Sequence, residues 1–254
     1  MRWTDGLKDF FHRQSAPKNF YATCGQLLPW FVWPAVLLML AGLVVGWGFA
    51  PLQAGGQFES YRIIYIHVPA ATLSLMVYVY MAIAAAVGLI WHIKVAEITA
   101  FCCAPVGAWF TLLALVTGSI WGKPTWGTWW QWDARMTSEL VLLFLYMGLI
   151  GLGNAIEDRR SAANATAILT LSGVVLIPFI YLSVDPKMGF NTLHQGITEF
   201  SNPKVVDPRI SWAVRLMILS FLMYFAVSLL LRIRNEILYR DRNTQWVKQM
   251  VRDL

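Results

Sequence analysis

Residues 63–91 read IIYIHVPAATLSLMVYVYMAIAAAVGLIW, an apolar stretch without a single Asp, Glu, Lys or Arg. A helix needs about 20 mainly apolar residues to cross a bilayer, because each residue adds about 1.5 Å along the axis. With 29 residues, this stretch is longer than one untilted crossing requires. It therefore predicts a membrane-spanning helix and indicates that the chain resides in a bilayer.

Five further stretches have the same character, and no region between them is long enough for a separate globular core. We predict an all-α integral membrane protein with six transmembrane helices, forming one membrane domain over residues 1–254. The predicted spans are 30–50, a crossing within 63–91, 102–121, 137–153, 165–184 and 212–231.

The composition supports this prediction. Of the 254 residues, 57% are hydrophobic and 13% are charged, whereas about 25% of residues are charged in an ordinary soluble domain. The three cysteines are too few and too poorly spaced for a disulfide framework or a zinc knuckle. The formal charge of +6 is explained by the distribution of basic residues between the loops, so a nucleic-acid partner is not needed.

The distribution of Lys and Arg predicts the orientation. The two termini and the loops on their side carry 13 of these residues, and the other three connections carry 7. The positive-inside rule therefore places both termini in the cytoplasm. The outward-facing connections are then 51–62, 122–136 and 185–211. Residues 1–18 lack the short apolar core of a cleavable signal, so we expect the first span to act as its own insertion signal.

The second outward connection is unusually rich in tryptophan. Residues 121–135 read WGKPTWGTWWQWDAR and hold five of the thirteen tryptophans of the chain. An aromatic belt at the membrane interface explains one or two tryptophans at a helix end. Five in one loop, interleaved with glycine, favour a flat apolar surface for a large planar ligand. Asp133 and Arg135 add polar groups at its rim, and Arg135 lies at helical pairing distance from Glu139.

Two of the four histidines fall on the outward side. His67 precedes Pro69 at the outer end of the second span, and His194 lies in the third outward connection. A single histidine at such a place is usually a polar side chain at the interface. Two histidines on either side of a tryptophan-rich loop favour ligation of a metal-bearing planar group, because imidazole nitrogen is a common axial ligand of haem iron.

The same region offers cations for the two haem propionates, since guanidinium groups pair with carboxylates in a bidentate way. The candidates are Arg62, Lys123, Arg135 and Arg215. For Arg215, just inside the sixth span, simple extension of the side chain to the interface is an alternative explanation.

Residues 121–135 resemble the tryptophan-rich signature of WWD-domain haem-handling proteins. Within that group the chain resembles the heme exporter protein C (CcmC) family of bacterial cytochrome c maturation system I. The resemblance covers the whole chain, including Tyr-Ile-His-Val-Pro-Ala at 65–70 and Trp-Asp-Ala-Arg-Met-Thr-Ser-Glu-Leu at 132–140. The chain lacks the additional helices and histidines of the larger members, which argues against the synthetase that attaches haem to apocytochrome.

The resemblance implies the residues of the site. His67 and His194 would be the axial ligands of the haem iron. The haem surface would be formed by Trp121, Trp126, Trp129, Trp130, Trp132 and Asp133. Arg62 and Arg135 would support haem or its acceptor.

The resemblance also implies the function. The chain would bind haem b at the periplasmic face of the bacterial inner membrane and transfer it to the haem chaperone CcmE, without acting as an enzyme. Its partners would be the ATPase CcmA, the membrane subunit CcmB and the one-span protein CcmD. The chain contains no phosphate-binding Gly-Lys-Ser/Thr loop, so any use of ATP would belong to a partner.

Two alternatives remain at this stage. A b-type cytochrome for electron transfer would also use two histidines, but it usually needs haem at more than one depth. His67 and His92 cannot share one iron, because 25 residues of helix separate them by about 37 Å. A transporter that moves haem across the membrane would be expected to show repeats, broken helices or polar residues at mid-membrane. The predicted spans show almost none.

Overall fold

The computed structural model describes residues 15–52, 59–190, 192–194 and 206–253. Within these ranges the chain is helical and contains no strand. The helical elements are α2 (Pro17–Leu43), η1 (Val44–Phe49), η2 (Glu59–Ile63), α3 (Ile64–Trp91), α4 (Lys94–Trp126), α5 (Ala134–Ala155), α6 (Arg159–Gly173), α7 (Leu176–Leu182), η3 (Pro186–Met188), α9 (Pro208–Arg240) and α10 (Gln245–Arg252).

Six helical segments among the described residues are long and apolar enough to cross a membrane, which confirms the predicted fold. Each segment begins before its predicted span, and the third, fourth and sixth also end after it, because these helices continue into polar sequence past the apolar stretch. The first and fifth segments end slightly earlier than predicted. The segments are Pro17–Phe49, Glu59–Trp91, Lys94–Trp126, Ala134–Ala155, Arg159–Leu182 and Pro208–Arg240.

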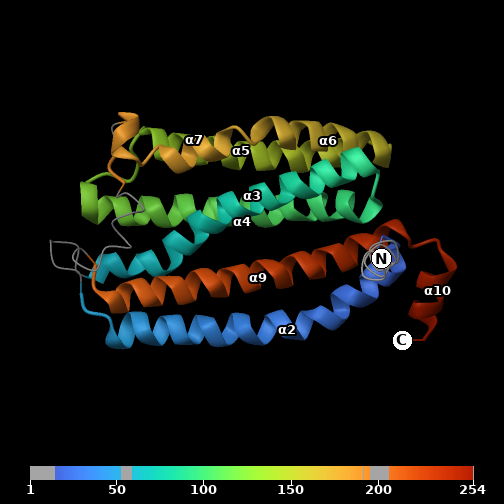
Figure 1. Cartoon of the computed structure of the whole chain (residues 1–254), viewed down its shortest axis with the longest axis horizontal. Helices are drawn as coiled ribbons and strands as arrows, with labels where there is room; N and C mark the ends of the chain where they lie inside the picture. Colours follow the sequence, from blue (N-terminus) through green and yellow to red (C-terminus); the bar gives the residue numbers. More distant parts are fainter. Residues whose placement is uncertain (1–14, 53–58, 191, 195–205, 254) are drawn as a thin grey trace, which may run out of the picture.

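The helices form three layers (Figure 1). Helices α3 and α4 pair closely and form the middle layer, and α2 pairs with α9 on one side of it. Helix α5 lies with α6 and α7 on the other side. The start of α2 and the end of α9 lie at one end of the bundle, and the loop between α4 and α5 lies at the opposite end, which we call the loop end.

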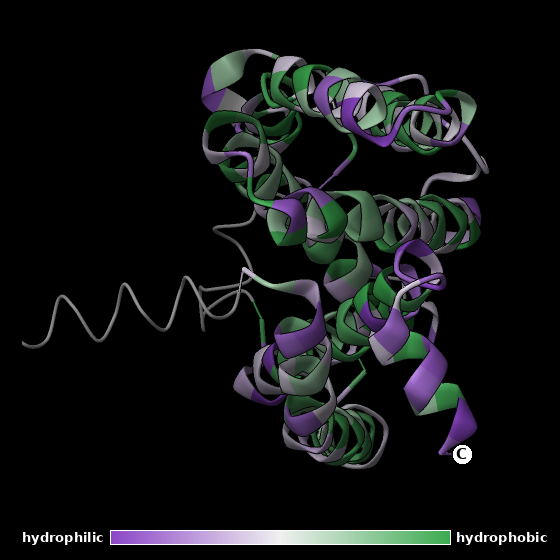
Figure 2. Ribbon diagram, turned by 90° about the vertical axis from the view of Figure 1, so that its right-hand side faces the viewer, coloured by the Kyte–Doolittle hydropathy of each residue, from purple (hydrophilic) through white to green (hydrophobic). Residues whose placement is uncertain are grey.

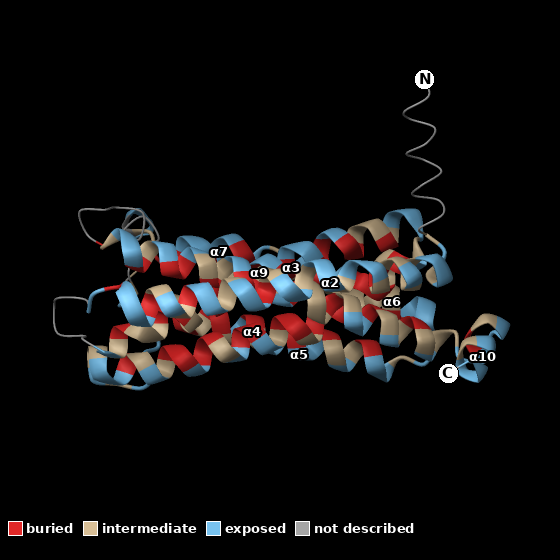
Figure 3. Ribbon diagram, turned by 90° about the horizontal axis from the view of Figure 1, so that it is seen from below, coloured by how far each residue is buried: buried red, intermediate tan, exposed pale blue. Residues whose placement is uncertain are grey.

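Burial follows this arrangement. In the most apolar window of each span, 61% of the α4 residues are buried but only 11% of the residues in the α2 segment. Buried residues lie along the inward sides of the helices and exposed ones around the outside (Figure 3). The ribbons are mainly hydrophobic along their length, and hydrophilic residues gather at helix ends and on α10 (Figure 2). The outer surface is therefore apolar, as a bilayer requires.

Helix α4 corrects one expectation from the sequence. The tryptophan-rich segment was predicted to be a loop from residue 122, but α4 continues to Trp126 despite Pro124. It ends at Gly127, whose φ of 80° is left-handed and whose N–H donates to the Lys123 carbonyl at 3.1 Å. Gly127 is the usual residue type at such a helix end, because it has no Cβ to clash. Trp121 and Trp126 therefore belong to a rigid helix.

The spans are also less regular than predicted. The fifth span is interrupted between α6 and α7, where the Tyr78 hydroxyl donates to the Thr170 carbonyl at 2.9 Å and the Val174 N–H donates to Leu171 instead. In α5, Glu139 is buried within the span and accepts a hydrogen bond of 2.6 Å from Ser74. The expectation that broken helices are almost absent is thus wrong for the fifth span. Glu139 lies only five residues after the start of α5, close to the loop end and not at mid-membrane.

Candidate functional site

A cavity of about 500 Å³ opens at the loop end of the bundle, between the middle layer and both outer layers. Its walls come from α3, α4, α9, the start of α5, the end of α7 and residues 193–194. Its volume lies in the range of about 300–1,000 Å³ that is typical of ligand pockets. Both outward histidines of the sequence analysis, His67 and His194, line this one cavity, although 127 residues separate them.

His67 lies on the first turns of α3 and is held by residues of α4. Its Nδ1 atom is 3.1 Å from the Thr117 hydroxyl oxygen. The edge of its ring packs against Trp121, with 5.7 Å between ring centroids and 75° between planes. The close pairing of α3 with α4 thus places this imidazole in the cavity wall at a defined angle.

His194 is held by the residues just before α5. Its Nδ1 atom lies 3.3 Å from the Asp133 carboxylate and 3.4 Å from the Thr192 hydroxyl, and its ring packs edge-on against Trp126 at 5.2 Å. Because an ionised carboxylate can only accept, Nδ1 carries a proton, and Nε2 is the nitrogen that could bind a metal. A carboxylate behind a histidine is a common arrangement for orienting a metal ligand.

Asp133 has two structural roles. One carboxylate oxygen caps α5 by accepting the Met136 N–H at 2.7 Å, and the other accepts from Thr192 at 2.7 Å and faces His194. Burial by itself would raise the pKa of Asp133, but the hydrogen bonds from His194, Met136 and Thr192 lower it to about 2. The residue is only 6% exposed, so the expectation that it lies at a rim close to water is wrong.

The five tryptophans of the signature fall into two groups. Trp121 and Trp126 line the cavity, and each packs against one of the two histidines. Trp129, Trp130 and Trp132 do not line it. Trp129 is 57% exposed and Trp132 is 76% exposed. The structure thus does not bring the five rings together into one surface at the cavity.

We therefore expect Trp121→Ala and Trp126→Ala to lower the haem affinity of the purified protein by about 2- to 10-fold each, since an aromatic pair contributes roughly 0.5–1.5 kcal/mol. Trp132→Ala is the matched control, because its exposed ring touches neither histidine. Titration of the apoproteins with haem, followed by absorbance, measures these affinities. Equal losses in all three variants would contradict the division of the tryptophans into two groups.

The four basic residues proposed to pair with the propionates also fall into two groups, those that line the cavity and those that do not. Arg135 and Arg215 line the cavity. Arg135 donates to the Ile180 carbonyl at 2.9 Å and lies 3.9 Å from Glu139, which confirms the expected helical pair. Arg62 instead donates to the Trp47 carbonyl and pairs with a glutamate of its own segment. Lys123 donates to a backbone carbonyl at the end of α4. Neither of these two lines the cavity.

The cavity is polar at one end and apolar at the other. The wall along α3 runs from His67 to Met76, about 14 Å of helix. The deeper part is lined by Leu75, Met76 and Ile218. The part nearer the loop end contains the histidines, the two arginines and Thr125. The buried hydroxyl oxygen of Thr125 has no hydrogen-bond partner among the described residues. An amphiphilic planar ligand with an apolar body and acidic groups at one edge suits this distribution.

The donor set fits haem better than a bare metal ion. Among the described residues, no group of three His, Cys, Asp or Glu side chains could hold a metal ion. Two imidazoles that line one cavity from different elements suit an iron whose other ligands come from a macrocycle. The cavity therefore offers axial nitrogen, apolar contact and cations for acidic groups.

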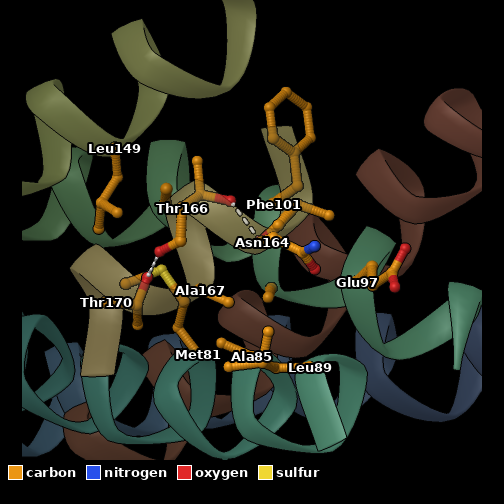
Figure 4. Close-up of a pocket in the computed structure, with 13 residues that line it drawn as sticks. Met81, Ala85, Leu89, Glu97, Phe101, Leu149, Asn164, Thr166, Ala167 and Thr170 are labelled. Atoms are coloured by element: carbon orange, nitrogen blue, oxygen red, sulfur yellow. Dashed lines mark hydrogen bonds between the residues drawn. The ribbon is translucent and has the colours of Figure 1, made fainter. Parts of the chain in front are cut away.

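Two other hollows in the described part of the chain lie toward the opposite end. One, shown in Figure 4, measures about 20 Å³ between α3, α4, α5 and α6 and is lined mainly by small and apolar residues. Such a volume holds about one water molecule. The other measures about 420 Å³ and is lined by charged side chains such as Arg159, Arg232 and Glu236, without a histidine. Neither resembles a haem site.

Sequence reasoning missed three residues of the site. Thr117 and Thr192 lie behind the two histidines, and Tyr181 from α7 lines the cavity. Thr117 and Tyr181 come from spans that were judged only by hydropathy. Thr192 had a local signal, because a threonine two residues before a histidine can bond to its backbone, as the 3.2 Å contact with the His194 N–H shows.

A six-span helical bundle with a cavity of this kind at one end defines a multi-pass membrane protein with a ligand-binding site. The CcmC family model, described as "Heme exporter protein C", matches residues 10–248. The chain therefore belongs to the heme exporter protein C family.

Individual relatives agree with this assignment. Heme exporter protein C of Escherichia coli K12 is 47% identical over 240 residues, which cover 94% of this chain and 96% of the relative. The proteins of the same name from Haemophilus influenzae and Rhodobacter capsulatus are 44% and 42% identical. They cover 96% and 93% of this chain, and the matches span 98% and 96% of their own lengths.

Proposed function

We propose that the protein binds haem b in the loop-end cavity, with His67 and His194 as axial ligands of the iron. The observation that carries this proposal is that both imidazoles line one cavity of about 500 Å³. Arg135 and Arg215 would pair with the propionates, and Trp121 and Trp126 would hold the two imidazole rings at their angles. The relatives are named as heme exporters, a name that describes transport rather than catalysis.

The proposed location is the bacterial inner membrane, with the loop end facing the periplasm. The excess of Lys and Arg on the side of the termini supports this orientation, since it is 13 against 7. The start of α2 and the end of α9 lie at the end opposite the cavity, as this topology requires. Haem in the cavity would then be accessible from the periplasm.

The protein would present haem to the periplasmic chaperone CcmE during maturation of c-type cytochromes, together with CcmA, CcmB and CcmD. The open side of the cavity supports transfer of haem to a partner rather than permanent retention of haem. Two of its lining residues, Tyr181 and Met76, are 53% and 45% exposed. Because both residues lie within membrane-spanning segments, this opening is at the side of the bundle that faces lipid, and a resident b-type haem for electron transfer would need a more enclosed site.

A transfer assay distinguishes these functions. We expect haem-loaded protein in lipid nanodiscs to lose most of its haem when purified CcmE is added, with a matching gain of covalent haem on CcmE. Absorption spectra of the separated proteins measure both quantities, and CcmE lacking its haem-attachment residue is the control. Haem that stays on this protein in the presence of competent CcmE would support the electron-transfer alternative.

A further inference from the structure

We propose that Thr117 is a positioning residue that fixes the tautomer of His67 and directs its Nε2 lone pair into the cavity. This inference rests on the proposed function, because it concerns the ligand that His67 offers to the haem iron. It goes beyond that function by assigning a role to a residue of α4 that does not itself line the cavity.

The hydrogen bonds around Thr117 determine the direction of its contact with His67. The Thr117 hydroxyl donates to the Leu113 carbonyl at 2.6 Å, with the Ala114 carbonyl at 3.2 Å as a second acceptor. A threonine hydroxyl has a single proton. Toward the Nδ1 atom of His67, 3.1 Å away, the oxygen is therefore an acceptor. Nδ1 must carry the imidazole proton, which leaves the lone pair on Nε2.

The neighbouring residues of α4 restrict the rotation of the same ring. A Cβ atom added at Gly118 would lie 3.0 Å from the Cε1 atom of His67, so the imidazole lies directly against the glycine backbone. Trp121 contacts the ring from one turn further along. Three residues of α4 therefore contact the imidazole of His67 and determine both which nitrogen carries the proton and how the ring is oriented: Thr117, Gly118 and Trp121.

The two histidines are held by unlike groups. The Nδ1 atom of His194 faces the Asp133 carboxylate at the start of α5, whereas that of His67 faces a neutral hydroxyl inside a membrane span. A carboxylate at the position of Thr117 would place a charge in an apolar environment, which is costly. The Thr117 hydroxyl donates its proton to the helix backbone, so its oxygen can accept the Nδ1–H of His67 without placing a charge in the membrane.

Removal of this acceptor has a measurable result. We expect Thr117→Val to lower haem affinity by about 10- to 100-fold, the usual effect of losing an outer-shell partner of a metal ligand. The reduction potential of the bound haem should rise, because an imidazole that keeps only the Ala114 backbone as a hydrogen-bond acceptor donates less electron density to the iron. Thr117→Ser keeps the hydroxyl and should restore both quantities.

Thr111→Val is the matched control. Thr111 is fully buried on the same helix and donates to the Gly107 carbonyl at 2.8 Å, and it has no hydrogen bond with a histidine among the described residues. If Thr117→Val and Thr111→Val have the same affinity and potential, while His67→Ala still loses haem, the positioning role is wrong and the proposed function stands. If His67→Ala keeps the wild-type haem content and spectrum, the ligand assignment itself fails.

Discussion

Replacement of His67 by alanine is expected to lower the haem affinity of the purified protein by more than about 100-fold, which exceeds the range typical of outer-shell changes. The physical reason is the loss of one axial bond to iron, from a side chain that the structure holds in the cavity wall by α4. His194→Ala should have a similar effect. Haem titration and the absorption spectrum of the reduced protein measure the change.

The control for this prediction is His92→Ala. His92 caps the opposite end of α3, so its removal tests the general effect of losing a histidine from the same helix. Added imidazole should partly restore haem binding in His67→Ala, since it can enter the space left by the side chain. Wild-type affinity in both His67→Ala and His194→Ala would show that haem binds elsewhere.

The second large effect is expected at Asp133. Asp133→Ala removes the acceptor behind His194 and the N-cap of α5 at once. The first loss should lower haem affinity by about 10- to 100-fold, and the second should destabilise the helix by about 0.5–2 kcal/mol. Asp133→Asn keeps a capping oxygen but no charge, so it should retain most of the stability and still lose affinity.

Asp158 provides the matched control for the capping role. It caps α6 by accepting the Ser161 N–H at 2.7 Å, and the start of α6 lies at the end of the bundle opposite the loop end (Figure 1). Asp158→Ala should therefore lower thermal stability by a similar amount without changing haem affinity. Equal affinity losses in Asp133→Ala and Asp158→Ala would mean that Asp133 acts only through helix stability.

The fold could be predicted from hydropathy because membrane spans are defined by length and apolar composition. Their ends could not, since a helix continues into polar sequence as long as its backbone hydrogen bonds are made. The stretch before Gly127 illustrates the difficulty: the apolar stretch ends at Trp121 and Gly122 favours a turn, but α4 continues through Gly122 and Pro124 to Trp126. This error made all five tryptophans look equivalent, although only Trp121 and Trp126 belong to α4 and face the cavity.

The two histidines could be predicted as a pair from their place on the same side of the membrane. The residues that orient the two histidines could not be predicted, because helix packing decides which side chains contact them. Thr117 is 50 residues from His67, and only the close pairing of α3 and α4 brings them together. The sequence does carry a signal for the placement of Asp133. An aspartate directly before a long apolar helix is a typical N-cap, and such residues are tied to the backbone rather than free at a rim.

The most direct test of the central claim is a cryo-electron microscopy map of the haem-loaded protein in lipid, at a resolution that shows side chains. We expect planar density in the loop-end cavity, with the iron between the Nε2 atoms of His67 and His194 and with the propionates toward Arg135 and Arg215. Planar density stacked on Trp129, Trp130 or Trp132 outside the cavity, or an iron that lacks either histidine, would contradict it.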